Sequence, residues 1–219
     1  MNTVFDPKLQ QAVSACGNIA VVVIDDADKA VPLARALLAG GVSVMELTFR
    51  TDAALEAVRR VVADVPEMIV SAGTILTVDQ LRAAKDAGAA FAVAPGFNPR
   101  IVQAAIDMGL SYAPGVMTPS EIEGAVELGC RLLKFFPASV VGGIKAIETL
   151  VAPYKHLGLR YIPLGGLKPE NTADYLASPI IAACGGSWIA PGKLIAASDW
   201  AAITANAAKA TEIAHTVRG

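Results

Sequence analysis

The fold of this chain is decided by residues 88–135, GAAFAVAPGFNPRIVQAAIDMGLSYAPGVMTPSEIEGAVELGCRLLKF. Within this stretch a helix-like segment repeatedly ends at a glycine that a short apolar run follows: Gly88 precedes Phe91, Gly109 precedes Ser111, and Gly129 precedes Arg131. Glycine often ends a helix because it adopts left-handed backbone angles without strain. A repeat of about twenty residues, with one helix and one strand in each copy, predicts a parallel α/β fold.

The same alternation extends over the whole chain. We expect eight strands, at residues 19–24, 44–48, 68–71, 91–93, 111–113, 131–135, 161–163 and 180–183. Because right-handed crossovers place each strand beside the previous one, these units favour an α/β fold of the (βα)8 TIM barrel type, as a single domain over residues 1–219. An open doubly wound sheet is the alternative. It would carry a glycine-rich turn after the first strand, where this chain has Asp25, Asp26, Ala27 and Asp28.

Several helix starts can be placed from local patterns. Residues 7–16 form an amphipathic segment, which we expect to be an extra N-terminal helix that covers the bottom of the barrel. Residues 77–80 and 118–121 have the capping-box pattern of a helix start. The last helix is expected at residues 198–217, with Ser198 as its N-cap.

Composition excludes several classes of protein. Among the 219 residues, 54% are apolar but only 5% are aromatic, which suits helices packed on a buried parallel sheet. A net charge of −2 with interspersed signs predicts no binding to nucleic acid or membranes. The three cysteines lack CxxC spacing, and His156 and His215 are isolated, which favours a reducing compartment without a metal site. No secretory or bilayer-spanning segment is visible, so we expect a cytoplasmic protein.

Lys134 is the one charged residue in the apolar run 132–136. Burial in such a strand removes water from an ammonium group, so the site must supply a partner or hold the neutral amine. A neutral lysine amine is a nucleophile toward ketones. Alternatively, the side chain reaches solvent at the strand end or pairs with a carboxylate from elsewhere in the chain.

Glu46 is the one ionisable residue in the predicted strand at 44–48. A partly buried carboxylate there would suit general acid–base catalysis near neutral pH, and a structural acid paired with Arg50 or Lys134 is the alternative. Arg50 can bind a carboxylate or phosphate through two parallel hydrogen bonds, or it is a solvated loop arginine. Because barrel active sites form at the C-terminal ends of the strands, we expect these three residues in one site.

Glycine pairs follow the last two predicted strands, at Gly165-Gly166 and at Gly185-Gly186, with Ser187 next in the chain. Exposed backbone N–H groups at glycines before a helix form an anion cradle, and barrels commonly hold phosphate in the loops after strands seven and eight. Either pair alone is usually only a turn. Together they predict a phosphorylated small-molecule ligand.

Two longer stretches are Gly41-Val-Ser-Val-Met-Glu46-Leu-Thr-Phe-Arg50 and Gly129-Cys-Arg-Leu-Leu-Lys134-Phe-Phe-Pro-Ala138, the second followed by Gly142-Gly143. They resemble the signature motifs of the 2-keto-3-deoxy-6-phosphogluconate (KDPG) aldolases. The resemblance covers nearly the whole chain, through Ala72-Gly73-Thr74, Ala94-Pro95-Gly96, Pro114-Gly115, Gly165-Gly166 and Gly185-Gly186-Ser187-Trp188.

This resemblance implies a class I aldolase on a barrel, in the family's usual homotrimer. Such an enzyme cleaves KDPG to pyruvate and glyceraldehyde 3-phosphate in the Entner–Doudoroff pathway, without a metal or other cofactor. The resemblance assigns Schiff-base formation to Lys134 and proton transfer to Glu46. It further implies substrate-binding residues: Arg50 and Thr74 at the pyruvyl carboxylate, Gly165, Gly166, Gly186 and Ser187 at the phosphate, and Pro95 and Phe136 in the pocket wall.

Two positions differ from the family pattern. Leu164 stands where the family usually has threonine before the glycine pair, and Ala20 stands where the first strand usually carries a proline. Loss of the hydroxyl at position 164 removes a possible hydrogen bond to the sugar chain. We therefore expect some tolerance for the galactonate epimer, and a 2-keto-3-deoxy-6-phosphogalactonate aldolase is an alternative function. The family's activity on 4-hydroxy-2-oxoglutarate is a further candidate.

Two other classes of function fit the same residues. In the first, the protein is a phosphosugar isomerase or epimerase, with Glu46 as the base and Lys134 as an electrostatic clamp that never becomes covalent. In the second, the protein binds a phosphate or sugar acid without turnover. Reduction of an imine on Lys134 by borohydride in the presence of pyruvate would distinguish the aldolase from both.

Overall fold

The computed structural model describes residues 4–219. The strands are β1 Asn18–Val22, β2 Val44–Thr48, β3 Ile69–Gly73, β4 Phe91–Val93, β5 Ser111–Ala113, β6 Gly115–Val116, β7 Leu132–Phe135, β8 Arg160–Pro163 and β9 Cys184–Gly186. The α-helices are α1 Pro7–Cys16, α2 Ala30–Ala39, α3 Ala54–Asp64, α4 Val78–Asp86, α5 Pro99–Met108, α6 Pro119–Glu127, α7 Gly143–Val151, α8 Pro169–Leu176, α9 Gly192–Ala197 and α10 Trp200–Arg218. Two 3₁₀ helices, η1 Ala27–Lys29 and η2 Ala152–Leu157, complete the elements.

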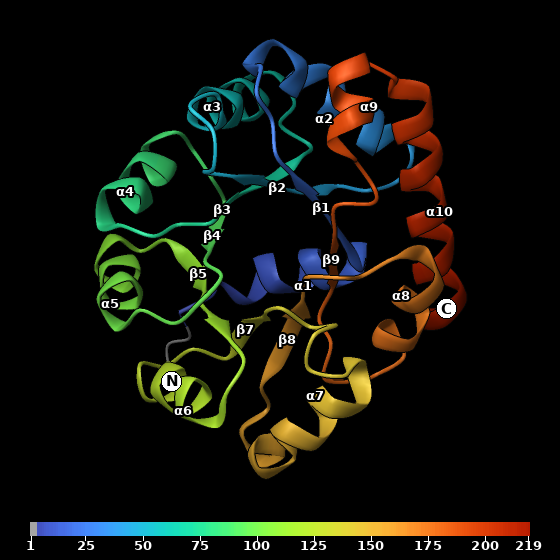
Figure 1. Ribbon diagram of the computed structural model, residues 1–219. Helices are drawn as coiled ribbons and strands as arrows, with labels where there is room; N and C mark the ends of the chain where they lie inside the picture. Colours follow the sequence, from blue (N-terminus) through green and yellow to red (C-terminus); the bar gives the residue numbers. More distant parts are fainter. Residues whose placement is uncertain (1–3) are drawn as a thin grey trace.

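The strands are arranged in two parallel sheets. One has the order β5-β4-β3-β2-β1-β9, and the other has the order β6-β7-β8. Pro114 alone separates β5 from β6, and a bridge between Tyr161 and Ile181 joins β8 to the segment before β9. The strands curl around a common centre with helices outside them (Figure 1). The predicted α/β class with a parallel sheet is confirmed.

The first seven predicted strands are present, with ends that differ by at most two residues, but the eighth is wrong. The predicted strand at 180–183 is replaced by β9, which pairs with β1. Residues 180–183 are apolar, yet the Ile181 N–H bonds the Ser178 carbonyl at 3.1 Å and holds their start in a turn. Regular pairing begins where the chain reaches β1, because there the Cys184 N–H bonds the Gly17 carbonyl at 2.9 Å.

The local signals for helix ends are mostly confirmed. Both capping boxes form, at Thr77 with Gln80 and at Thr118 with Glu121. Ser198, however, is not the N-cap of the last helix. It ends α9 with a left-handed φ of 54°, and the neighbouring Asp199 caps α10 by accepting a hydrogen bond from the Ala202 N–H at 3.1 Å. A carboxylate and a hydroxyl are both good N-caps, so composition alone does not separate adjacent candidates.

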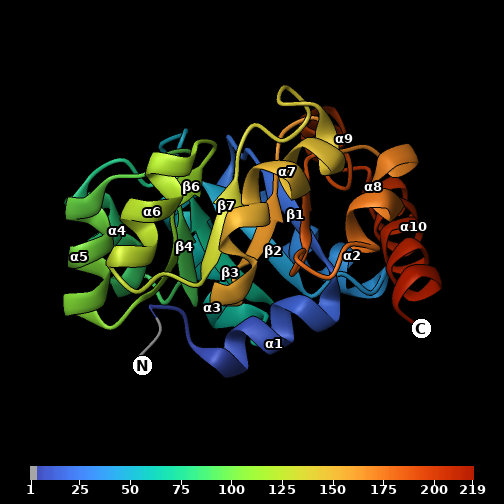
Figure 2. The same ribbon diagram turned by 90° about the horizontal axis from the view of Figure 1, so that it is seen from below.

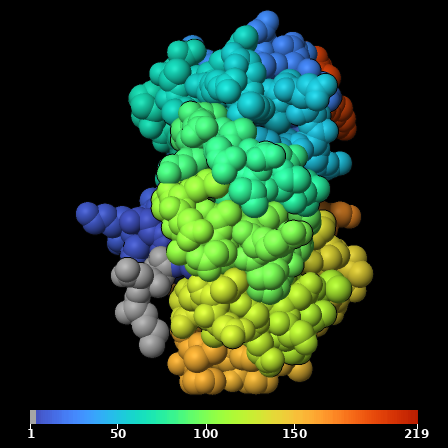
Figure 3. Space-filling view, turned by 90° about the vertical axis from the view of Figure 1, so that its left-hand side faces the viewer, coloured from blue at the N-terminus to red at the C-terminus, as the bar shows by residue number. Residues whose placement is uncertain are grey.

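The apolar core has two parts. An inner cluster brings Phe5 and Val13 of the N-terminal region together with strand residues such as Leu132 and Ile162. A larger outer cluster lies between the strands and the helices. Figure 2 shows α1 crossing one end of the strands, which leaves the other end for the strand-end side chains. On the face in Figure 3, the segments that contain α3 to α6 pack side by side.

Cys130 and Cys184 are buried and form no disulfide, and His156 and His215 are exposed. Over residues 4–219, no cluster of three potential metal ligands occurs. None of the helices in that range has the length and apolar character needed to cross a bilayer.

Candidate active site

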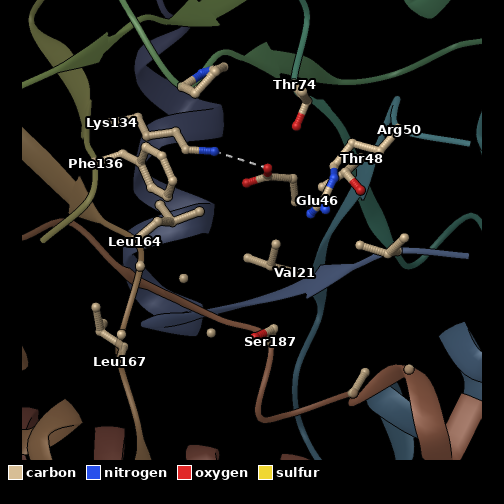
Figure 4. Close-up of a pocket in the computed structure, with 18 residues that line it drawn as sticks. Val21, Glu46, Thr48, Arg50, Thr74, Lys134, Phe136, Leu164, Leu167 and Ser187 are labelled. Atoms are coloured by element: carbon tan, nitrogen blue, oxygen red, sulfur yellow. Dashed lines mark hydrogen bonds and ion pairs between the residues drawn. The ribbon is translucent and has the colours of Figure 1, made fainter. Parts of the chain in front are cut away.

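A cavity of about 260 Å³ opens at the carboxyl ends of the strands (Figure 4). It is lined by every residue that the sequence analysis places in the site: Glu46, Arg50, Thr74, Pro95, Lys134, Phe136, Gly165, Gly166, Gly186 and Ser187. These residues come from β2, β7 and β9 and from the segments that follow β2, β3, β4, β7, β8 and β9. The curled sheet therefore brings together side chains that lie far apart in the sequence.

The buried pair Lys134 and Glu46 forms the polar centre of the cavity. Lys134 is the third residue of β7 and Glu46 is the third residue of β2, and these strands lie on opposite sides of the ring of strands (Figure 1). The Lys134 Nζ donates a hydrogen bond of 3.1 Å to the Glu46 Oε1 (Figure 4). Lys134 is 4% exposed and Glu46 is 2% exposed, so the lysine does not reach solvent, and Glu46 is the carboxylate partner that its burial requires.

This pair is suited to chemistry at a carbonyl group. The Phe136 ring lies with its centroid 5.7 Å from the Lys134 Nζ and shields one side of the amine. A carboxylate at hydrogen-bond distance from an amine can accept a proton from it and return that proton to an oxygen bound nearby. The other side of the amine faces the cavity, where a substrate carbonyl has room to approach (Figure 4).

Thr74 has an unusual backbone conformation for a β-branched residue. Its φ is 59°, in the left-handed region that such residues rarely adopt. Strain of this kind costs about 1–3 kcal/mol and persists only where the surrounding structure enforces it. The Thr74 side chain points into the cavity above Glu46 (Figure 4). The strained turn after β3 thus presents a hydroxyl toward the buried pair.

Arg50 lies beyond the end of β2 at the cavity wall. Its side chain is exposed, and within residues 4–219 it forms no ion pair with a carboxylate. An unpaired guanidinium beside a cavity can grip a planar anion through two parallel hydrogen bonds. Arg50 is thus an exposed loop arginine, as in the alternative, and it also lines the cavity.

The glycine-rich wall lies on the other side of the cavity. Gly165 and Gly166 follow β8 with φ of 90° and 79°, angles that favour glycine. Gly186 ends β9, and Ser187 is exposed directly after it. Backbone N–H groups without neighbouring side chains can approach an anion closely.

The cavity also contains residues that the sequence analysis does not place there: Val21, Val23, Thr48, Leu167, Ala190 and Gly192. Thr48 is the most polar of them, and it is 4% exposed with its hydroxyl donating to the Val22 carbonyl at 2.9 Å. Side chains two residues apart in a strand lie on the same face, so the position of Thr48 relative to Glu46 could have predicted its place in the cavity from the sequence.

The two positions that differ from the family pattern have different places. Leu164 lines the cavity, whereas Ala20 is buried outside it and pairs with Gly186.

The two buried thiols play no part in this cavity. Burial raises the pKa of Cys130 to about 12 and that of Cys184 to about 12, so both remain protonated at neutral pH. The Lys134 amine lines the cavity, whereas these two thiols do not.

Comparison with known proteins gives one consistent family. A family model described as KDPG and KHG aldolase matches residues 9–206. The chain is 44% identical over 187 residues to a protein from Treponema pallidum (strain Nichols) named 2-dehydro-3-deoxy-phosphogluconate aldolase, covering 85% of this chain and 88% of that protein.

Solved structures agree with the sequence relatives. A KDPG aldolase of Zymomonas mobilis ZM4 with 3-phosphoglycerate superposes with a TM-score of 0.86 at 35% identity, covering 93% of this chain and 95% of that one. A KDPG aldolase from Legionella pneumophila, with pyruvate captured as a covalent carbinolamine intermediate, superposes with a TM-score of 0.87 at 34% identity. The superposition covers 92% of this chain and 97% of that one.

Proposed function

The chain belongs to the KDPG and KHG aldolase family, and we propose that it is a class I aldolase that cleaves KDPG to pyruvate and glyceraldehyde 3-phosphate. The observation that carries this proposal is the buried pair of Lys134 and Glu46 in a cavity that opens at the strand ends, with the Lys134 Nζ 3.1 Å from the Glu46 Oε1. A covalent carbinolamine with pyruvate in the Legionella relative supports the same chemistry. The family also supports cleavage of 4-hydroxy-2-oxoglutarate as a second activity.

Glu46 first accepts a proton from the Lys134 ammonium, and the neutral amine then attacks the ketone carbon of the substrate. The new C–N bond gives a carbinolamine as one proton passes from the nitrogen to the ketone oxygen, which becomes a hydroxyl group. Glu46 then delivers the proton that it took from the ammonium to that hydroxyl, which leaves as water. The product is a protonated imine that joins the substrate to Lys134.

The imine then accepts electrons from the bond that breaks. Glu46 receives the proton of the hydroxyl on the fourth carbon, the bond between the third and fourth carbons breaks, and its electron pair moves to the iminium nitrogen. Glyceraldehyde 3-phosphate leaves as the aldehyde, and an enamine of pyruvate stays on Lys134. Protonation of the enamine carbon and addition of water to the imine release pyruvate and the free amine.

The two ends of the substrate match the two walls of the cavity. We assign the carboxylate to Arg50 and Thr74, because the guanidinium has no carboxylate partner among residues 4–219 and lines the same cavity as the Lys134–Glu46 pair (Figure 4). The phosphate is assigned to the glycine-rich wall of Gly165, Gly166, Gly186 and Ser187. Pro95 and Phe136 provide apolar walls between these ends. The assigned residues carry out the chemistry without a metal or other cofactor.

Trapping of the imine tests the proposal. We expect pyruvate with sodium borohydride to attach irreversibly to Lys134, as measured by mass spectrometry of the digested protein, and Lys134→Ala to remove the label. A phosphosugar isomerase with a non-covalent lysine would give no label. Unlabelled wild-type protein would therefore exclude the Schiff-base mechanism.

We also propose the architecture that this function uses. The two sheets, joined at Pro114 and at the bridge between Tyr161 and Ile181, would form one (βα)8 barrel domain over 1–219, with α1 as its additional N-terminal helix. Residues 1–3 of that domain lie outside the described residues.

A cytoplasmic homotrimer is the expected assembly. Light scattering of the purified chain, giving three times the 22.5 kDa mass, would support it.

A further inference from the structure

We propose that Gly73 is a positioning residue for the Glu46 carboxylate, an inference that rests on the catalytic role proposed above. Gly73 is the last residue of β3, and it pairs with Thr48 of the neighbouring strand β2. Its carbonyl accepts a hydrogen bond of 2.8 Å from the Phe49 N–H. The glycine therefore lies beside the strand that carries Glu46.

The backbone at Gly73 does not itself require glycine. Its φ is outside the left-handed region, in contrast to the φ of Gly165 and Gly166 in the same cavity. Gly73 also continues the regular pairing of β3 with β2. Any L-residue can adopt such a strand conformation. A reason for glycine here must come from the space that its missing side chain leaves.

That space is occupied by the Glu46 side chain. A Cβ atom on residue 73 would lie 2.6 Å from the Glu46 Cγ, 2.7 Å from its Cδ, and closer still to its Oε1. Those positions cannot coexist, because non-bonded carbon atoms have their optimal separation at about 3.5–4.0 Å. The Glu46 side chain thus passes over Gly73 on its way to Lys134.

An alanine at position 73 would move the carboxylate while leaving the fold in place. The three atoms nearest to that Cβ all belong to the Glu46 side chain, so rotation of that side chain relieves the overlap with them. The rotation breaks the 3.1 Å contact with Lys134. Arg50 contributes none of the three nearest atoms, so its contact with the substrate carboxylate is retained. The expected kinetic result is a fall in kcat with little change in KM.

The experiment is a double-mutant cycle on the wild type, Gly73→Ala, Glu46→Ala and the double variant. The first measurement is the exchange of pyruvate methyl protons with deuterium by NMR, which reports enamine formation without the second substrate fragment. We expect Gly73→Ala to lower the exchange rate by about 100-fold or more. The second measurement is the Tm, which we expect Gly73→Ala to lower by several degrees.

The Glu46→Ala background makes the test specific. Removal of the glutamate side chain also removes the atoms that an alanine at 73 would meet. Addition of Gly73→Ala to Glu46→Ala should therefore change neither the residual exchange rate nor the Tm. Gly124→Ala is the matched control, because the three atoms nearest its Cβ would also belong to one side chain, with the Phe97 Cε1 at 2.7 Å, and neither residue lines the cavity. It should leave the exchange rate unchanged.

Wild-type exchange in Gly73→Ala, or an equal loss of Tm from that substitution in both backgrounds, would overturn the inference. A wild-type protein without any exchange would contradict the proposed aldolase function. The Tm cycle would still report whether residues 73 and 46 are coupled, so the two failures can be told apart.

Discussion

The Lys134 Nζ and the Glu46 Oε1 lie 3.1 Å apart, and the two side chains are 6% and 3% exposed. The residues are separated by 88 positions in the chain and come from strands of different sheets. If one partner of a buried ion pair is removed, the charge that remains is buried without compensation, and the folded state is destabilised. The pair therefore links the stability of the protein to the chemistry of its site.

Loss of one member of this pair should destabilise the fold. Lys134→Met keeps the volume of the side chain but leaves the Glu46 carboxylate buried without its partner. We expect the free energy of unfolding, measured with urea, to fall by about 3 kcal/mol. Lys134→Met with Glu46→Leu should recover most of that loss, since no charge remains unpaired. Equal losses in the single and double variants would contradict an energetic link.

Ser187 and Lys134 should have different kinetic effects. The Ser187 side chain is exposed at the glycine-rich wall, so Ser187→Ala removes binding that the substrate and transition state share. It should raise KM and leave kcat nearly unchanged. Lys134→Ala removes the nucleophile and should lower kcat by about 10³-fold or more. Steady-state kinetics on KDPG would measure both, and a kcat loss of similar size in Ser187→Ala would contradict the assignment.

Leu164 should set the preference between substrate epimers. This residue is 4% exposed and lines the cavity, and its side chain occupies space beside Gly185, where a Cβ would fall 2.5 Å from the Leu164 Cγ. Leu164→Thr supplies a hydroxyl, and we expect it to raise the ratio of kcat/KM for the gluconate over the galactonate epimer. Leu164→Val is the control, because valine matches threonine in shape but has no hydroxyl. An unchanged ratio in Leu164→Thr would count against this role.

The three cysteines should differ in reactivity. Burial raises the pKa of Cys130 and Cys184 to about 12 each, and only the thiolate form of a cysteine reacts with alkylating agents. At pH 8 iodoacetamide should therefore label the half-buried Cys16 first, and labelling of the other two should increase as the pH rises toward 12. Peptide mass spectrometry would locate the label. All three should react in urea, and rapid labelling of Cys184 in the folded protein would disagree with its burial.

Signals that act over a few residues were readable from the chain. Glycine ends helices and a capping box begins them because of contacts within one turn, so Thr77 and Thr118 could be assigned from spacing alone. Glu46 and Lys134 were conspicuous for a similar reason, since each is the single charge in an apolar strand. A charge in such a strand needs compensation, whichever fold surrounds it.

Long-range pairing was needed for the rest. The apolar residues at 180–183 predict a strand there, but hydrogen bonding to β1 begins at Cys184, where the chain comes beside β1. The absence of a side chain at Gly73 leaves room for the Glu46 side chain, which comes from another strand, and this could be recognised only in the folded structure. Local spacing thus identified the alternation of helices and strands and the charged residues. The partner of each charge and the space around it came from packing, which depends on atoms distant in the chain.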